Sequence, residues 1–262
     1  MKIDLTFSVT NIDELQLREK NVVVIDVLRS STTVATALYN GAREIIPVPS
    51  IESAVKISGS LFGDVTLRGG ERGGKMIQGF NLGNSPLEYN EATVRGKSII
   101  YCTTNGSLAM AKSRYARSMV VAAFVNLSMV TEFLAQLNDD VVILCAGNST
   151  VANGFSLEDV VCGGMIVRKL SEAKNVSLDL SDSALAAQSL YKSFGRSVVK
   201  MLKNSTHGKY LAGIGYDNDI AFSAKVDSVP VLPALNGNVI KIRKEEQRVA
   251  EPEPGPVAKP NE

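Results

Sequence analysis

The chain has 262 residues, 45% of them apolar, and a formal net charge of +1. This near-neutral charge, with no run of Lys or Arg, argues against binding to nucleic acid or a membrane surface. Its three cysteines are too few for a disulfide framework, and neither a signal peptide nor the roughly 20 apolar residues of a membrane span is visible, so we expect a cytoplasmic location.

Short apolar, β-branched runs alternate with amphipathic segments, which indicates an α/β fold with a mostly parallel or mixed sheet flanked by helices. In chain order, we predict strands at residues 22–28, 44–48, 64–67, 98–102, 119–124 and 141–145. Helices are predicted at residues 32–39, 51–58, 107–113, 127–137 and 157–170. One further helix at residues 185–203 and a last strand at 239–242 complete the prediction.

Residues 1–244 are predicted to form the functional domain. Within it, VVVIDVLRSSTTVATAL and REIIPVPSIESAVKI resemble SIIYCTTNGSLAMAKS and MVVAAFVNLSMVTEFL, each pair giving strand, helix, strand, helix. This echo is either chance or the sign of two related α/β units, at about 1–95 and 96–244. Residues 245–262 hold four prolines and almost no large apolar side chains, so we expect a disordered tail there.

In open α/β sheets, ligands bind beyond the carboxyl ends of the strands, where loops meet helix N-termini. The first polar cluster at such a position contains Asp26, Arg29 and Ser30. An Asp in an apolar strand is costly to bury unless it is paired or binds a cation, and the hydroxyl groups after it suit an anionic oxygen. The alternative is that Asp26 pairs with Arg29 while the Ser/Thr run caps the helix.

The second cluster is the glycine-rich stretch RGGERGGK, which continues to Asn84 and Ser85. Glycines let the backbone approach a ligand and point successive N–H groups at an anion. Arg72 and Lys75 would add charge-assisted hydrogen bonds to phosphate or sulfonate oxygens. Glu71 places a carboxylate in the same loop. A flexible turn without a ligand is the alternative interpretation.

The third cluster is a polar turn between a strand and a helix, in which Thr103, Asn105 and Gly106 are candidates for substrate binding. Asn-Gly is also common turn chemistry. His207 is the one histidine of the chain, which excludes a two-histidine phosphatase site and a His-rich zinc site. It either protonates a leaving oxygen or is a surface or capping residue.

The fourth cluster lies at the predicted start of a helix. Ser156 fits the N-cap position, and Glu158 and Asp159 form an acidic first turn. The carboxylates either complement the helix dipole or form the hard-oxygen patch that Mg²⁺ prefers. Together, the clusters supply carboxylates for a hard cation and cations for an anionic substrate.

These clusters, in this order, resemble the 2-phosphosulfolactate phosphatase family. The resemblance covers about residues 1–240 and rests on VVVIDVLRSSTT, GERGGKMIQGFNLGNSPLEY, CTTNG, CAG followed by NGFSLEDVVCGG, STHGKYL and DIAFSAKVD. It implies a Mg²⁺-dependent phosphatase that converts (2R)-phospho-3-sulfolactate to 3-sulfolactate and phosphate, in the sulfopyruvate branch of coenzyme M synthesis. The family pattern GFDLGNSP reads GFNLGNSP here, so we do not expect Asn81 to bind metal.

We therefore predict a metal site, directly or through water, at Asp26, Glu71, Glu158 and Asp159. Arg29, Arg72 and Lys75 would bind the phosphate and the sulfonate or carboxylate, and Thr103 and Asn105 would complete the oxyanion shell. Either water or Asp26 attacks the phosphorus. Two alternatives stay open: another small phosphorylated hydroxy acid as substrate, and a polyanion-binding protein without catalysis. Soluble enzymes of this size commonly self-associate, so we expect a homo-oligomer, with a dimer favoured.

Overall fold

The computed structural model of the chain describes residues 1–60, 65–149 and 154–243, so the tail predicted at 245–262 lies outside it. Its strands are β1 Lys2–Thr6, β2 Asn21–Ile25, β3 Glu44–Pro47, β4 Thr66–Arg72, β5 Lys75–Met76, β6 Ser98–Cys102, β7 Ser118–Ala122, β8 Val141–Cys145, β9 Asp179–Leu180, β10 Pro233–Asn236 and β11 Val239–Ile242. They form a mixed sheet in the order β5-β4-β6-β3-β11-β10-β7-β2-β8-β1-β9. The predicted fold class is confirmed.

The α-helices that flank this sheet are α1 Glu14–Leu17, α2 Ser30–Tyr39, α3 Ile51–Ser60, α4 Glu91–Val94, α5 Gly106–Lys112, α6 Leu127–Leu137, α7 Leu157–Ser171, α8 Asp182–Phe194, α9 Val198–Asn204, α10 Thr206–Gly213 and α11 Asp217–Ser223. Short 3₁₀ turns lie at η1 Val9–Asn11, η2 Pro86–Glu88 and η3 Phe124–Asn126. None of these helices is long and apolar enough to cross a membrane.

The parallel strands pair within two half-sheets. In one, β6 lies between β3 and β4; in the other, β2 lies between β7 and β8, and β1 follows β8. Every residue of β2 and β6 is buried, because helices cover both faces of parallel strands. This two-sided burial explains why both strands are almost wholly apolar in sequence.

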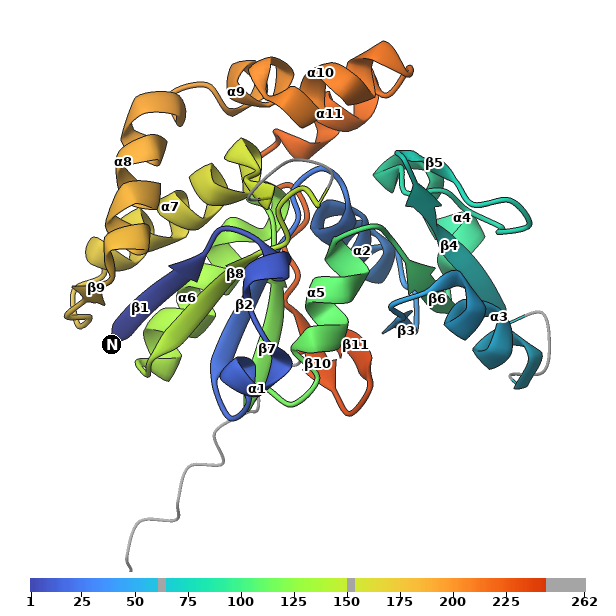
Figure 1. Cartoon of the computed structure of the whole chain (residues 1–262), viewed down its shortest axis with the longest axis horizontal. Helices are drawn as coiled ribbons and strands as arrows, with labels where there is room; N and C mark the ends of the chain where they lie inside the picture. Colours follow the sequence, from blue (N-terminus) through green and yellow to red (C-terminus); the bar gives the residue numbers. More distant parts are fainter. Residues whose placement is uncertain (61–64, 150–153, 244–262) are drawn as a thin grey trace, which may run out of the picture.

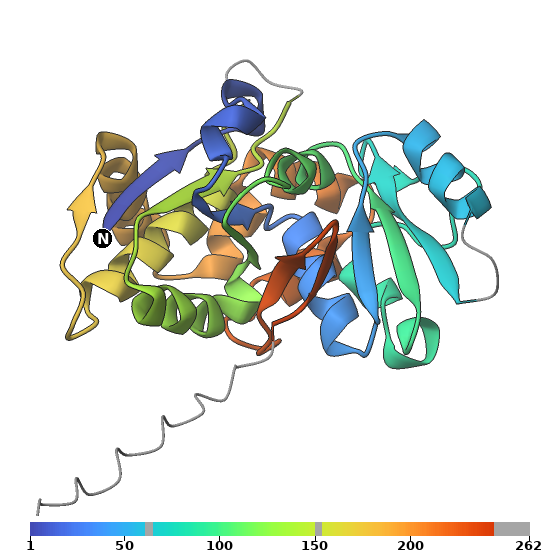
Figure 2. The same cartoon turned by 90° about the horizontal axis from the view of Figure 1, so that it is seen from below.

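The C-terminal hairpin joins the two half-sheets. Its strands β10 and β11 are antiparallel to each other, and each also pairs with one half-sheet, at Ala234 to Val120 and at Ile240 to Ile45. Figure 2 shows this hairpin in orange-red between the halves. Helix α2 contacts strands of both halves, and nine of its ten residues are buried. The last described strands therefore hold the middle of the sheet.

The strands of the two similar stretches of sequence pair with each other. The first contributes β2, α2, β3 and α3, and the second β6, α5, β7 and α6. Strand β2 pairs with β7 of the other stretch, and β3 pairs with β6. Each half-sheet thus mixes strands from both stretches, and a boundary near residue 95 does not divide the sheet.

The late helical region differs from the prediction. The single helix expected at residues 185–203 is wrong: α8 ends at Phe194, Gly195 is its C-cap, and α9 begins at Val198 after Ser197. Glycine is a poor helix former, and Ser is a favourable residue at a helix start, so the chain breaks here. In Figure 1, α8 to α11 arch over the carboxyl ends of the parallel strands from β9 towards β5.

The contact between α7 and α8 provides a test of this packing. A Cβ on Gly164 would lie 2.0 Å from the carbonyl oxygen of Ala187, so Gly164→Ala must push the two helices apart. We expect a loss of about 1–3 kcal/mol in the free energy of unfolding and a Tm lowered by roughly 3–10 °C. Thermal unfolding followed by circular dichroism measures it.

Gly213→Ala is the matched control. Gly213 is the last residue of α10, and its added Cβ would meet no atom within 4 Å. This variant should keep its Tm or gain slightly, because alanine restricts the unfolded chain. Equal Tm values for the two variants would contradict the close packing of α7 on α8.

Candidate active site

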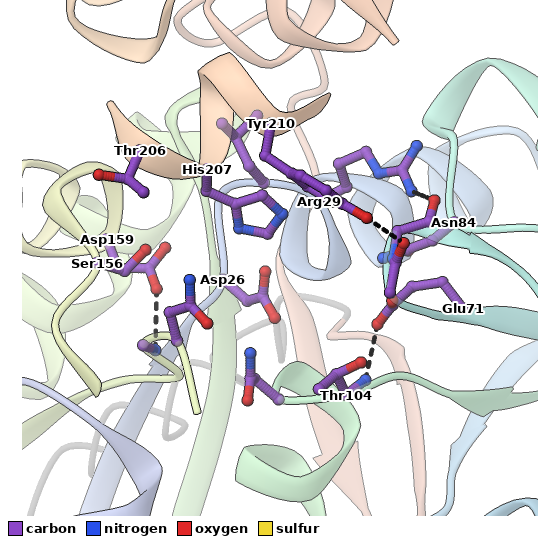
Figure 3. A pocket seen from close by; sticks show the side chains of 16 residues that line it. Asp26, Arg29, Glu71, Asn84, Thr104, Ser156, Asp159, Thr206, His207 and Tyr210 are labelled. Carbon is purple, nitrogen blue, oxygen red and sulfur yellow. Dashed lines mark hydrogen bonds between the residues drawn. The ribbon is translucent and has the colours of Figure 1, made fainter. Parts of the chain in front are cut away.

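A cavity of about 390 Å³ lies where the carboxyl ends of β2, β4, β6 and β8 meet the arch of late helices. It draws on both half-sheets, and Figure 3 shows His207 and Tyr210 of α10 above Asp26. The residues that line it are Asp26, Leu28, Arg29, Glu71, Gly73, Gly74, Asn84, Thr104, Asn105, Gly147, Asn148, Ser156, Asp159, Thr206, His207 and Tyr210.

Asp26 follows β2 and is 9% exposed. One carboxyl oxygen accepts a hydrogen bond from the backbone N–H of Ser30 at 3.2 Å. The pKa of Asp26 is raised to about 7, chiefly by burial and also by the charges of Glu71 and Glu158, whereas the Ser30 N–H and the charge of Arg29 oppose the shift. Asp26 is therefore held close to the midpoint of its titration at neutral pH.

Glu71, at the end of β4, connects two loops through its carboxylate. Oε2 accepts from the N–H of Gly74 at 2.8 Å, and Oε1 accepts from the N–H of Thr104 at 2.7 Å. These bonds fix the turn between β4 and β5 against the loop that follows β6. Both carboxylate oxygens are thus engaged by backbone groups.

Asp159, in the first turn of α7, connects two other loops through its carboxylate on the other side of the cavity. Oδ1 accepts from the N–H of Val27 at 2.8 Å, and Oδ2 from the N–H of Gly147 at 3.1 Å. Burial raises the pKa of Asp159 well above its usual value, as do the charges of Asp26 and Glu158, whereas the two backbone bonds lower it. Ser156 is the N-cap as predicted, but its side chain makes no capping bond.

Glu158 is the carboxylate whose charge the protein leaves least compensated. It is 1% exposed, and neither oxygen has a hydrogen-bond partner among the described residues. The nearest cationic group is Nδ1 of His207, 3.8 Å from Oε1. Because an unpaired buried carboxylate is unfavourable, this side chain needs a partner that the described residues do not supply.

His207 lines the cavity from the first turn of α10. Burial lowers the pKa of its imidazole, and the charge of Arg29 lowers it further, whereas Glu158 raises it. The capping of this helix belongs to Ser205, whose hydroxyl accepts from the N–H of Gly208. The histidine therefore faces the site instead of closing the helix.

Arg29 lines the cavity but does not pair with Asp26. Its guanidinium donates to Asp219 at 2.7 Å, in a buried ion pair. Helix α2 begins directly after Arg29 without a side-chain cap. Both parts of the alternative for the first cluster are therefore wrong. The partner of Arg29 is 190 residues away and is not Asp26, and the start of α2 has no side-chain cap from its N-cap residue.

The other predicted cations, Arg72 and Lys75, do not line the cavity. Neighbouring residues in a strand point to opposite faces, so Glu71 faces the site and Arg72 turns away. The guanidinium of Arg72 donates to the carbonyl of Glu71 and to Sγ of Cys102. Lys75 lies exposed on β5. The structure thus brings the predicted carboxylates together, but not the predicted cations.

The remaining predicted residues divide between lining and support. Asn84 and Asn105 line the cavity. The hydroxyl of Thr103 accepts from the N–H of Ser107 in the first turn of α5, and that of Ser85 donates to Asp219.

Glycine is required at position 106 because the start of α5 lies against the first cluster. A Cβ there would lie 2.3 Å from Oγ of Ser30 and 2.5 Å from a carboxyl oxygen of Asp26. Gly106 and Ser30 therefore pack beside Asp26 but are not among the residues that line the cavity.

Several lining residues were not predicted, among them Tyr210, Thr206 and Thr104. Tyr210 donates to the carbonyl of Gly73 and so ties α10 to the turn after β4. Thr206 and Tyr210 lie within the segment STHGKYL, in which only the histidine has an obvious chemical role. The one sequence signal that could have indicated Thr206 and Tyr210 was their position close to His207 in the same helix.

No group of three or more His, Cys, Asp or Glu side chains in the described ranges is arranged to hold a metal ion by itself. A cation here would therefore need water or substrate oxygens as well. Of the four predicted ligands, Glu71 and Asp159 are engaged by backbone N–H groups, whereas Glu158 has two unpartnered oxygens and Asp26 has one weak bond. Asp26 and Glu158 therefore have the carboxylate oxygens most open to a hydrated hard cation, although Glu158 is not itself among the residues that line the cavity.

The raised pKa of Asp26 predicts a pH-dependent stability in metal-free protein. The folded-state pKa, about 7, lies above the unfolded value, so this group's contribution is greatest in acid and is lost as pH rises through about 7. Asp26→Asn removes the charge, and we expect its Tm to exceed that of the wild type by about 3 °C or more at pH 8. At pH 4, near the unfolded pKa, the two Tm values should be close. A difference independent of pH would contradict the burial of an ionisable Asp26.

Known proteins resemble this chain over most of its length. The family model described as 2-phosphosulpholactate phosphatase matches residues 7–238. A protein of Caldanaerobacter subterraneus subsp. tengcongensis named "Probable 2-phosphosulfolactate phosphatase" is 38% identical over 231 residues, covering 88% of this chain and 94% of its own length. Proteins with the same name are 40% identical in Carboxydothermus hydrogenoformans (89% of this chain, 92% of theirs) and 39% in Thermotoga maritima (86% and 93%).

Proposed function

The chain belongs to the 2-phosphosulfolactate phosphatase family, and from that premise we propose that its cavity hydrolyses (2R)-phospho-3-sulfolactate to 3-sulfolactate and phosphate with Mg²⁺. The family and the names of its members make the chain a phosphoric monoester hydrolase. The substrate and the metal are the proposed parts. The charge of the cavity is the observation that supports them.

The cavity is acidic although its proposed substrate is an anion. Asp26, Glu71 and Asp159 line it, and Glu158 lies next to His207. Arg29 is the one Arg or Lys among the lining residues, and its charge is already paired with Asp219. A phosphate ester would therefore meet carboxyl groups and, among the described lining residues, no Arg or Lys without an acidic partner, unless a cation came with it.

Mg²⁺ suits this arrangement because it keeps several waters and uses one or two carboxylates together with substrate phosphate oxygens. Asp26 and Glu158 would hold it, since their oxygens are the least engaged. When bound, such an ion polarises the phosphoryl group and offsets the charge that develops on the leaving oxygen. Glu71 and Asp159 would instead fix the loops around it.

The chain's own residues then have separable roles in hydrolysis. A P–O bond forms to water, the ester P–O bond breaks, water loses a proton and the leaving oxygen gains one. The Asp26 carboxylate would accept the proton from water. His207, whose protonated form is favoured by the charge of Glu158, would return a proton to the leaving oxygen. Asn84 and Asn105 supply amide groups for the anionic oxygens.

The metal can be tested on binding as well as on activity. Phosphate release from phosphosulfolactate should stop in excess EDTA and return with Mg²⁺. Without substrate, Mg²⁺ at about 100 times its Kd should raise the Tm of metal-free protein at pH 8 by about 5 °C or more. The shift should shrink at pH 5.5, where Asp26 is protonated. Full activity in chelator would refute the proposal.

Glu158→Gln isolates the unpartnered carboxylate. We expect kcat to fall by a factor of about 100 or more and the Tm shift with Mg²⁺ to be lost, while the fold is kept because Gln has the same shape. Glu172→Gln, at the other end of α7, is the matched control, because Glu172 is exposed and pairs only with Arg168 among the described residues. Near wild-type turnover and an unchanged Mg²⁺ shift in Glu158→Gln would leave this residue without a metal-binding role.

A further inference from the structure

Asp219 lies in the first turn of α11, and both of its carboxylate oxygens accept hydrogen bonds from side chains of other segments. Oδ2 accepts from Nη1 of Arg29 at 2.7 Å, and Oδ1 accepts from the hydroxyl of Ser85 at 2.7 Å. The side chains of Asp219 and Arg29 are 2% and 1% exposed. The carboxylate is thus fixed between α11, the start of α2 and the segment before η2.

The guanidinium of Arg29 is held on other sides too. Nη2 donates to the carbonyl of Gly74 at 2.5 Å, and the ring of Tyr216 lies against the guanidinium with its centroid 4.0 Å away. A face contact of this kind orients the plane of the guanidinium as well as its position. Asp219 and Gly74 hold its edge, and Tyr216 holds its face.

A contribution to the stability of the fold does not by itself explain why the guanidinium of Arg29 is held in one orientation. A buried ion pair commonly gives little net stabilisation, because both charges lose their hydration. Here the cation lines the cavity, and its bonds to Asp219 and Gly74 use two of the five donors of a guanidinium. The remaining donors of this guanidinium have no acceptor among the described residues.

The position of Arg29 suggests which part of a ligand it meets. Figure 3 shows Arg29 and Asp159 on opposite sides of the cavity, with Asp26 and His207 between them. A metal held by Asp26 and Glu158 would place the phosphoryl group on the side of those carboxylates. The substrate proposed above carries a sulfonate and a carboxylate besides its phosphate. Each of these groups presents two or more oxygens that can accept hydrogen bonds from a guanidinium.

We propose that Asp219 is a positioning residue, which holds the guanidinium of Arg29 where it binds the substrate's second anionic group, the sulfonate or carboxylate, and not the phosphoryl group. This inference rests on the proposed function, because a second anionic group is a property of that substrate. Asp219 itself touches no substrate. It determines specificity through the direction in which Arg29 points.

Binding of the two products separates the two ends of the cavity. 3-Sulfolactate carries the second anionic groups without phosphate, and inorganic phosphate is the other half of the substrate. In calorimetric titrations with Mg²⁺ present, we expect Asp219→Asn to weaken 3-sulfolactate binding 10-fold or more and to change phosphate binding less than 3-fold. Asn keeps the size and one acceptor oxygen but loses the charge that directs Arg29.

A merely structural or electrostatic role gives a different result. Loosening of the whole site would weaken both ligands alike, and simple removal of a negative charge would strengthen both. Either result, or unchanged 3-sulfolactate binding, overturns the inference. Asp217→Asn is the control, because Asp217 is exposed in the same turn of α11; both affinities should change less than 2-fold.

Ser85→Ala keeps the test decisive if Asp219→Asn does not fold. It leaves the ion pair in place and removes only the hydroxyl that donates to Asp219. We expect 3-sulfolactate binding alone to weaken 2- to 5-fold. If no such selective weakening is measured, the inference is overturned.

The proposed function fails separately, if wild-type protein releases no phosphate from phosphosulfolactate. Wild-type protein that binds no 3-sulfolactate overturns the role of Asp219 as well.

Discussion

The repulsion among four carboxyl groups in one buried site is the constraint on which the rest of this structure depends. Asp26, Glu71 and the adjacent pair Glu158 and Asp159 come from three segments, and burial removes the water that would otherwise screen their charges. A fold that only packed apolar side chains would not tolerate this. Each carboxyl group must find a proton, a hydrogen-bond donor or a cation.

The protein meets this constraint in two ways. Glu71 and Asp159 receive two backbone N–H groups each, so their charge is stabilised by loops that they in turn hold together. Asp26 and Glu158 lack comparable donors among the described residues. In the function proposed above, this unevenness leaves Asp26 and Glu158 as the two groups able to accept a cation or a proton.

Local sequence patterns predicted the parallel strands and the acidic clusters well, because these depend on near neighbours. An Asp at the end of the apolar strand before α2, and two carboxylates at the start of α7, stand out in any reading of the chain. The strand at residues 141–145 and the helix at 127–137 are confirmed with their predicted bounds. Periodicity and the chemistry of helix starts were sufficient for these.

Long-range partners were beyond the sequence. Arg29 suggested a phosphate ligand, but its guanidinium pairs with Asp219, far along the chain. Arg72 suggested another, but its neighbour Glu71 takes the face of β4 that meets the cavity, and the pleat turns Arg72 away. DIAFSAKVD reads as an ordinary helix with an acidic first turn, and nothing local in it indicates a buried ion pair. Tertiary packing decides such cases.

The place of the C-terminal hairpin has a consequence for how the enzyme is made. By the time Cys145 has left the ribosome, every long parallel strand of both half-sheets exists, yet β10 and β11, which join them, are still to come. The cavity takes Thr104 from one half and Gly147 from the other. A nascent chain can therefore build two partial sheets early, but its catalytic pocket can close only after β10 and β11 have been made.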